Sequence, residues 1–365
     1  MTMSTSDAEA EHRKRTATNW PQWIGYVTAV WSGAYGLLGL SWALGGAAFP
    51  FGEENTLLAG AEPEPTGWAA ASLGLLGAVI AVAMSRPRPR RRLVGPTAFA
   101  WTLAAGLTVL IPDSRPMIAL IRAPMMLIGT PLGLVPDDLT AADYFSAFLP
   151  WPVVNQLVLM AGGLLWAGTA VAHRRRLDDA CRRCGRSDRE ASRWTSPAAA
   201  ARWGRWAVAV AVAVPVGYAA TRWAWALDIP LGVPQEGLDE LEAESPGIWW
   251  AGALLATLAL GGAVLTLGLV QKWGEVYPRW MPGLRGRTVR PRTAIVPASV
   301  IALLITSTGL SYVRHYTLGG ADIAWDSWAM YVPQLFFPLW GAGLGAAALA
   351  YHLRRRRRCP SCGLG

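Results

Sequence analysis

The 365-residue sequence has little charge, because Asp, Glu, Lys and Arg make up 16% of it while 53% of its residues are hydrophobic. A water-soluble chain has roughly 25% charged residues, so this one lacks the polar side chains to cover a globule of its size. It also has only four cysteines, too few for a disulfide-rich secreted scaffold. The composition therefore predicts an all-α, polytopic membrane protein.

Eight apolar stretches are long enough to cross a bilayer core about 30 Å thick, which takes about 20 residues per helix. They lie at residues 22–45, 67–84, 93–112, 148–172, 204–227, 248–270, 294–316 and 329–351. We predict that each is a transmembrane helix of a multi-pass protein in the cell membrane.

Basic residues are unevenly distributed among the segments between these stretches. If the N-terminus is cytoplasmic and the helices alternate in direction, 29 of the 33 Lys and Arg residues lie inside and 16 of the 24 acidic residues lie outside. The positive-inside rule therefore predicts that both termini are cytoplasmic. The basic clusters then face the anionic lipid of the inner leaflet, and no motif indicates a nucleic-acid partner.

A further apolar segment, residues 117–134, complicates this count. It contains Arg122, Pro124 and Pro131, which suit a straight helix in lipid poorly, and a ninth span would place the most arginine-rich loop outside. We therefore expect a re-entrant or interfacial segment on the outer face.

An internal duplication relates the two halves of the chain. At an offset of 178, residues of the fourth stretch recur in the eighth: Gln156 and Gln334, Gly163 and Gly341, Cys181 and Cys359, and Cys184 and Cys362. The first and fifth stretches match at an offset of 183, as in Trp42 and Trp225. Four helices per half give both halves the same orientation, which predicts two parallel four-helix repeats.

The duplication predicts the domain organisation. It comprises a cytoplasmic N-terminal tail (1–21), a first repeat (22–172), a cytoplasmic linker with a CxxC motif (173–203), a second repeat (204–351) and an arginine-rich cytoplasmic tail with a second CxxC motif (352–365).

Residues 40–46 read Leu-Ser-Trp-Ala-Leu-Gly-Gly and follow Tyr35 and a run of small residues. This sequence resembles the end of the first helix in a family of small four-helix actinobacterial membrane proteins, and residues 224–227 resemble it more weakly. The family is uncharacterised, so the resemblance implies a four-helix membrane architecture and no activity. Ser41 departs from the larger aromatic residue expected there.

The four cysteines form two CxxCG motifs, each after the end of an equivalent helix: Cys181, Cys184, Cys359 and Cys362. Two residues between thiolates is the spacing of a tetrahedral zinc site, and the glycine permits a tight turn. We predict a structural Zn²⁺ ion that clamps the two halves together at the inner surface. A redox-active dithiol pair is the alternative, because neighbouring arginines favour thiolates.

Ionisable residues in or beside membrane spans are candidates for a binding site. Those near the outer ends of the helices are Asp113, Arg115, Arg122, Arg222, Arg314, His315, Asp322 and Asp326. Arginines among them suit a carboxylate or phosphate group. Gln156 and Gln334 form a repeat-related pair within the hydrocarbon region, where they are candidates for a hydrogen bond between the halves.

No nucleotide-binding loop, zinc-protease motif or serine-hydrolase motif occurs in the sequence. We therefore predict a protein that binds or transports a small amphiphile or anion at the interface of the repeats. The alternative is a membrane-embedded enzyme acting on a lipid or isoprenoid from the outer leaflet, with Asp113, Asp322 or Asp326 as acid or base.

Overall fold

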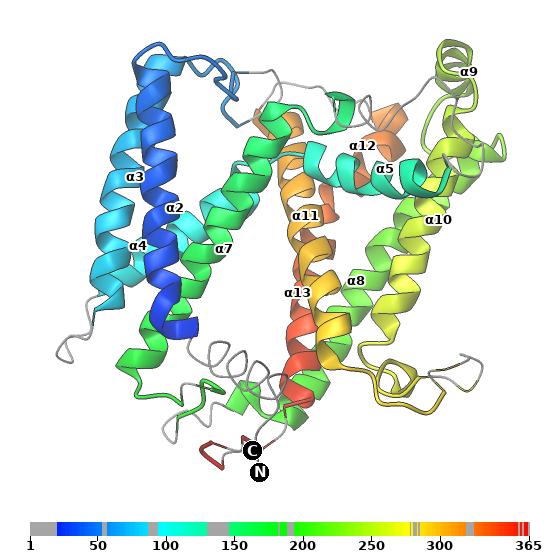
Figure 1. Ribbon diagram of the computed structural model, residues 1–365. Helices are drawn as coiled ribbons and strands as arrows, with labels where there is room; N and C mark the ends of the chain where they lie inside the picture. The colour runs from blue at the N-terminus through cyan, green and yellow to red at the C-terminus, as the bar shows by residue number, and fades with distance from the viewer. Residues whose placement is uncertain are drawn as a thin grey trace. The chain divides into compact units, whose positions relative to one another are not determined.

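The computed structural model of the chain is built from helices (Figure 1). The structure describes residues 20–52, 57–86, 94–129, 146–181, 183–187, 193–277, 279, 283, 285–318, 325–356, 358–359 and 361–363.

The chain divides into two compact units, each described by itself below. Unit 1 comprises Met1–Pro112, Ile118–Ala191 and Arg357–Gly365, and unit 2 comprises Asp113–Met117 and Ser192–Arg356. The C-terminal residues that follow the last helix of unit 2 therefore belong to unit 1, with the loop that follows α7.

Unit 1 contains four of the long helical segments. They are α2 (Trp20–Ala43), α3 (Pro63–Ser85), α4 (Val94–Ala105) with its π-helical extension η1 (Gly106–Leu110), and α7 (Trp151–Leu177). Helix α2 packs against α3 and α7, and α4 packs against α7. Helix α5 (Arg115–Gly129) follows η1 and begins among the residues of unit 2.

Glycines let α2 and α3 approach backbone to backbone. A Cβ atom built on Gly39 would lie 2.8 Å from the backbone nitrogen of Ala71, and one on Gly74 would lie 2.6 Å from the Cα atom of Gly36. Small residues at helix interfaces permit this close approach in membranes, where van der Waals contact takes over from the hydrophobic effect.

The centre of unit 1 is the indole of Trp166, which has no exposed surface. It contacts the ring of Phe99 on α4 edge-on, with centroids 5.5 Å apart. The hydroxyls of Thr28 on α2 and Thr169 on α7 lie 2.8 Å apart in a buried hydrogen bond. Such bonds satisfy polar groups that lipid cannot satisfy.

Unit 2 contains the remaining long helices. They are α8 (Pro197–Ala226), α10 (Ile248–Leu267), α11 (Pro291–Leu318), and the pair α12 (Trp328–Leu335) and α13 (Phe337–Arg354). Helix α8 packs against α10 and α13, and α11 packs against α13. The buried core of unit 2 includes Ile305, Leu344 and Tyr351. The Tyr351 hydroxyl donates a hydrogen bond to the backbone oxygen of Gly274 at 2.7 Å.

Most helix boundaries differ from the predicted spans by a few residues, and two differences have a clear local reason. Helix α8 begins at Pro197, inside the expected linker, because the Ser196 hydroxyl caps it by accepting a hydrogen bond from the Ala199 backbone nitrogen. The eighth expected span is broken at Phe336, where Pro338 cannot donate the backbone hydrogen bond that a continuous helix needs.

Between α8 and α10, residues 235–244 form the short helix α9 (Gln235–Glu244). Its burial is confined to Leu238, which joins a small cluster with Trp225 and Ala329. The Leu238 side chain and the hydrogen bond that its backbone oxygen accepts from the Trp249 indole hold this polar helix against the unit.

Among the described residues, six helices are long and apolar enough to cross a membrane, or seven if one bent pair is a single span. The bent pair joins Val94–Leu110 to Arg115–Ala123 at 59°, in the region where a re-entrant or interfacial segment was expected. Helices form at all eight predicted places. Helix α2 is not among the six, because Trp, Tyr, Ser and Gly dilute its apolar character, so the eighth crossing stays a prediction.

Large apolar side chains on these helices are exposed in both units. Val30 on α2, Val79 on α3, Leu254 on α10 and Leu265 on α10 are each more than half exposed. Exposed large apolar side chains are unfavourable in water and ordinary against lipid. Together with the candidate spans, they identify the chain as a multi-pass membrane protein.

Candidate metal centre

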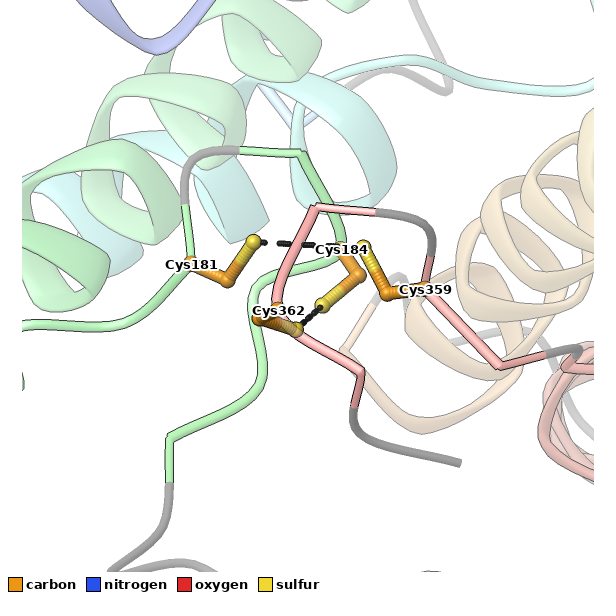
Figure 2. Close-up of side chains that lie close together, drawn as sticks. All are labelled: Cys181, Cys184, Cys359 and Cys362. Carbon is orange, nitrogen blue, oxygen red and sulfur yellow. Dashed lines mark hydrogen bonds between the residues drawn. The ribbon is translucent and has the colours of Figure 1, made fainter.

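Both CxxC motifs belong to unit 1 and face each other (Figure 2). The four sulfur atoms of Cys181, Cys184, Cys359 and Cys362 all lie within 4.8 Å of one another. The Sγ atoms of Cys181 and Cys359 are 4.0 Å apart, and those of Cys184 and Cys362 are 3.5 Å apart. These distances are far longer than the roughly 2.05 Å of a disulfide, and all four cysteines are free.

A tetrahedron of thiolates around zinc has Zn–S bonds of about 2.3 Å, which places the sulfurs about 3.8 Å apart. The two measured separations bracket that value. The four-cysteine cluster therefore has the size and ligand type of a tetrathiolate metal site.

The two motifs adopt the same backbone turn. The backbone nitrogen of Gly185 donates to the oxygen of Cys181 at 2.8 Å, and that of Gly363 donates to Cys359 at 2.8 Å. Both glycines have φ of +73°, a conformation that costs a glycine nothing and other residues appreciable strain. The sequence thus uses one turn twice, and residues 178 positions apart supply each close pair of sulfurs.

Backbone N–H groups within each turn favour the thiolate form of the first cysteine. The N–H of Cys184 is the main cause of the lowered pKa of Cys181, and that of Ser361 is the main cause of lowering the pKa of Cys359 to about 6. Burial raises the pKa of Cys184 to about 12. The cluster thus combines thiols that ionise readily with one that needs a cation to ionise.

Arg175, in the last turn of α7, is the positive charge beside the cluster. A Cβ atom on Gly185 would lie 2.6 Å from its Cζ atom, and the guanidinium interacts electrostatically with Cys181 and Cys184. The Cζ atom of Arg175 also lies 5.1 Å from the centre of the Trp20 ring. Because four thiolates around Zn²⁺ carry a net charge of −2, this arginine compensates charge next to the ligands.

Sequence reasoning did not single out Arg175. It is one of three consecutive arginines, and nothing in their order distinguishes the one that turns toward the cysteines.

Asp113, Arg115 and Arg314, three of the predicted binding residues, come together in unit 2. Asp113 is 7% exposed and accepts from the backbone nitrogen of Arg115 at 2.8 Å and from its Nε at 2.9 Å. The Nη2 atom of Arg115 completes the ion pair at 2.9 Å. Arg314 on α11 interacts electrostatically with the same carboxylate, so one acid serves two arginines.

Other predicted residues have separate surroundings. The guanidinium of Arg122 lies 4.8 Å from the Phe148 ring, and His315 contacts the adjacent Tyr316 ring edge-on. Asp326 is exposed and accepts from the Ser327 hydroxyl. Asp322 lies outside the described residues.

Gln156 is buried in α7, and Gln334 in α12 accepts from the Tyr316 hydroxyl at 3.3 Å. The expected hydrogen bond between the two glutamines stays a prediction. Arg222 is buried in α8 among aromatic rings, surroundings that hydropathy alone did not indicate.

No family model, curated protein or solved structure matches this chain. The resemblance of residues 40–46 to the actinobacterial family accordingly stays a prediction. The residues of the chain itself show a multi-pass membrane protein with a four-cysteine cluster that could bind a metal ion.

Proposed function

We propose that the four-cysteine cluster binds a structural zinc ion in a multi-pass membrane protein that binds or transports a small amphiphile or anion. The observation that carries the zinc proposal is the convergence of all four sulfurs to within 4.8 Å from two distant parts of the sequence. Soft thiolate ligands in a tetrahedral arrangement select zinc over magnesium or calcium.

The role of this zinc is structural because four protein ligands leave no open position for a substrate or water. The metal ties the C-terminal residues 358–363 to the loop after α7. Four thiolates without a metal ion repel one another, so the site forms together with zinc binding. The free energy of zinc binding therefore contributes to the stability of the fold.

Metal analysis of the detergent-purified protein tests the proposal. We expect about one zinc per chain, as one tetrathiolate centre holds one ion, and loss of that zinc in Cys181→Ser and in Cys359→Ser. Ser361→Ala is the matched control, because it changes a side chain between two ligands and keeps the backbone N–H that favours the Cys359 thiolate. Wild-type protein without stoichiometric zinc would refute the proposal.

The geometry favours the metal over a redox dithiol. The sulfurs of both motifs converge, since all four lie within 4.8 Å of one another, with Cys181 next to Cys359 and Cys184 next to Cys362. A redox pair within one motif predicts a Cys181–Cys184 disulfide in the isolated protein, whereas the zinc site predicts four thiols that react with maleimide after chelation.

The tandem duplication is part of the same proposal. In unit 1, a Cβ atom on Gly163 would lie 2.9 Å from the backbone oxygen of Ala104, and in unit 2 one on Gly341 would lie 2.7 Å from that of Ala302. Thus α7 meets α4 as α13 meets α11, through glycines related by the sequence offset of 178. The other helix pairs follow the same scheme, since α2 meets α3 and α7 where α8 meets α10 and α13.

Binding or transport of an amphiphile or anion is supported by the arginines at this end of unit 2, among them the buried Arg222. Arg115 and Arg314 both interact with the carboxylate of Asp113. The enzyme alternative uses Asp113, Asp322 or Asp326 as an acid or base. Of these, Asp113 forms an ion pair with Arg115, which favours a charge-balancing role for its carboxylate.

A further inference from the structure

Arg222 is a buried arginine in a membrane helix. It lies four residues before the end of α8, which places it about 6 Å from that end at a rise of about 1.5 Å per residue, and it is 8% exposed. Among the described residues no carboxylate forms an ion pair with Arg222. The ion pairs of this part of the chain involve Arg115, Arg174, Arg354 and Arg355. A guanidinium stays protonated in proteins, so its charge requires compensation.

Aromatic rings on its own helix hold the guanidinium in place. Its Cζ atom lies 4.7 Å from the ring centre of Tyr218, one turn before it, and 4.3 Å from that of Trp225, about one turn after it. These cation–π contacts stabilise the positive charge in part. They supply no hydrogen-bond acceptor in the plane of the guanidinium.

Residues of other helices complete an aromatic enclosure, defined as Tyr218, Trp225, Tyr312, Tyr316 and Phe337. Phe337 contacts both Tyr218 and Tyr312, and Tyr312 stacks with Tyr316. Both of these phenols interact electrostatically with Arg222. The enclosure lies entirely within unit 2.

One edge of the guanidinium remains available. Its Nη1 atom donates to the Thr221 hydroxyl and to the Ala329 backbone oxygen, each at 3.4 Å. For Nε and Nη2 the described residues provide no acceptor. These two atoms form the side of the guanidinium whose parallel N–H groups match the two oxygens of a carboxylate or phosphate.

We propose that Arg222 binds the oxyanion group of an amphiphilic ligand through Nε and Nη2, inside the aromatic enclosure. The ligand supplies the missing negative charge and the two acceptors. Its apolar part lies against the lipid-facing side chains of unit 2, since the site is within about one turn of the helix end. This inference rests on the proposed binding function and assigns it a residue and a ligand chemistry.

Native mass spectrometry of the detergent-purified protein tests the assignment with oleate and its neutral analogue oleyl alcohol. The bidentate, charge-assisted hydrogen bonds predict that Arg222→Met weakens oleate binding by about 10- to 100-fold. Oleyl alcohol binding should not change. Arg222→Lys, which keeps the charge without the planar fork, should fall between wild type and Arg222→Met.

Arg292→Met is the matched control, because Arg292 is an exposed arginine in the first turn of α11, and it should bind oleate like wild type. Circular dichroism and gel filtration establish that each variant is folded. If Arg222→Met does not fold, Arg222→Lys carries the comparison.

The source of the oxyanion is distinguished by titrating acetate and inorganic phosphate calorimetrically. Arg222-dependent binding of these small anions as tight as that of oleate would keep the oxyanion site but overturn the amphiphilic character of the ligand, whereas dependence seen only with oleate supports the full assignment. Wild-type binding of oleate that Arg222→Met leaves unchanged would overturn the role of Arg222 alone. Failure of the wild type to bind any of these oxyanions would overturn the binding function as well.

Discussion

At the scale of single residues, Gly185 and Gly363 form a natural comparison. They have the same positive φ and make the same hydrogen bond, yet a Cβ atom on Gly185 would meet Arg175 while one on Gly363 would meet nothing within 4 Å. Backbone strain is therefore common to both positions, and contact with the arginine is specific to one.

We expect Gly363→Ala to weaken zinc binding through strain of about 1–2 kcal/mol, which is roughly tenfold in affinity. Gly185→Ala should weaken it further, because it also displaces the Arg175 guanidinium from beside the thiolates. Competition with a chromophoric chelator measures both. Equal losses in the two variants would show that Arg175 does not contribute.

The thiol pKa values give the zinc site a pH dependence of known sign. Zinc binds thiolates, so protons compete with it, and even the Cys359 thiol, with its pKa lowered to about 6, is protonated below that pH. We expect zinc to be retained above pH 7 and released as the pH falls through 6. Zinc content after dialysis across this range measures the release, and content that rises on acidification would contradict the assignment.

At the scale of elements, glycine contacts rather than matched large side chains hold α2 against α3. Gly39 has no room for a side chain, since a Cβ atom there would lie 2.7 Å from that of Ala70. Gly33 lies on the same helix and would meet nothing within 4 Å.

Gly39→Ala should therefore lower the stability of unit 1 by about 1–3 kcal/mol through overpacking. Gly33→Ala should be neutral or stabilising by up to about 1 kcal/mol, because alanine is the better helix former. Thermal unfolding in detergent compares the two. Similar melting temperatures for both variants would show that the α2–α3 contact is looser than the structure has it.

Helix positions were largely predictable, because an apolar run of about 20 residues has one stable solution in lipid. Helices form at each of the eight predicted stretches. The start of α8 at Pro197, the break at Phe336 and the helix α9 were not predicted. A cap and a proline decide the first two locally, whereas α9 packs against Trp225 and Ala329 from other helices.

At the scale of the whole molecule, the cysteine cluster constrains the topology. Because the sulfurs of residues 181 and 359 meet, an even number of membrane crossings separates them. The intervening candidate spans are α8, α10, α11 and the last span, Trp325–Arg354, which number four. The prediction that both motifs are cytoplasmic adds the side of the membrane on which they meet.

A membrane-impermeant maleimide applied with a chelator to oriented vesicles tests this topology. The double variant C181S/C184S reports the accessibility of the C-terminal cysteines, and C359S/C362S reports that of the other pair. Both should be labelled from the cytoplasmic face alone. Labelling of the two pairs from opposite faces would be incompatible with one shared metal site.

The candidate metal ligands follow from sequence because a CxxCG motif is local and its repetition at one offset identifies its partner. The role of Arg175 and the surroundings of Arg222 do not follow from it. The sequence does not distinguish among the three adjacent arginines at the end of α7. Packing alone brings one of them, Arg175, next to Gly185.

Hydropathy, charge and motif spacing thus determined by themselves that the chain is helical, membrane-embedded and equipped with two thiolate pairs, because each of these depends on neighbouring residues and the solvent around them. The tertiary structure decided that the four sulfurs converge, that Asp113 pairs with Arg115, and that one edge of Arg222 has no acceptor among the described residues. These depend on contacts between segments distant in sequence, which form only when the helices pack.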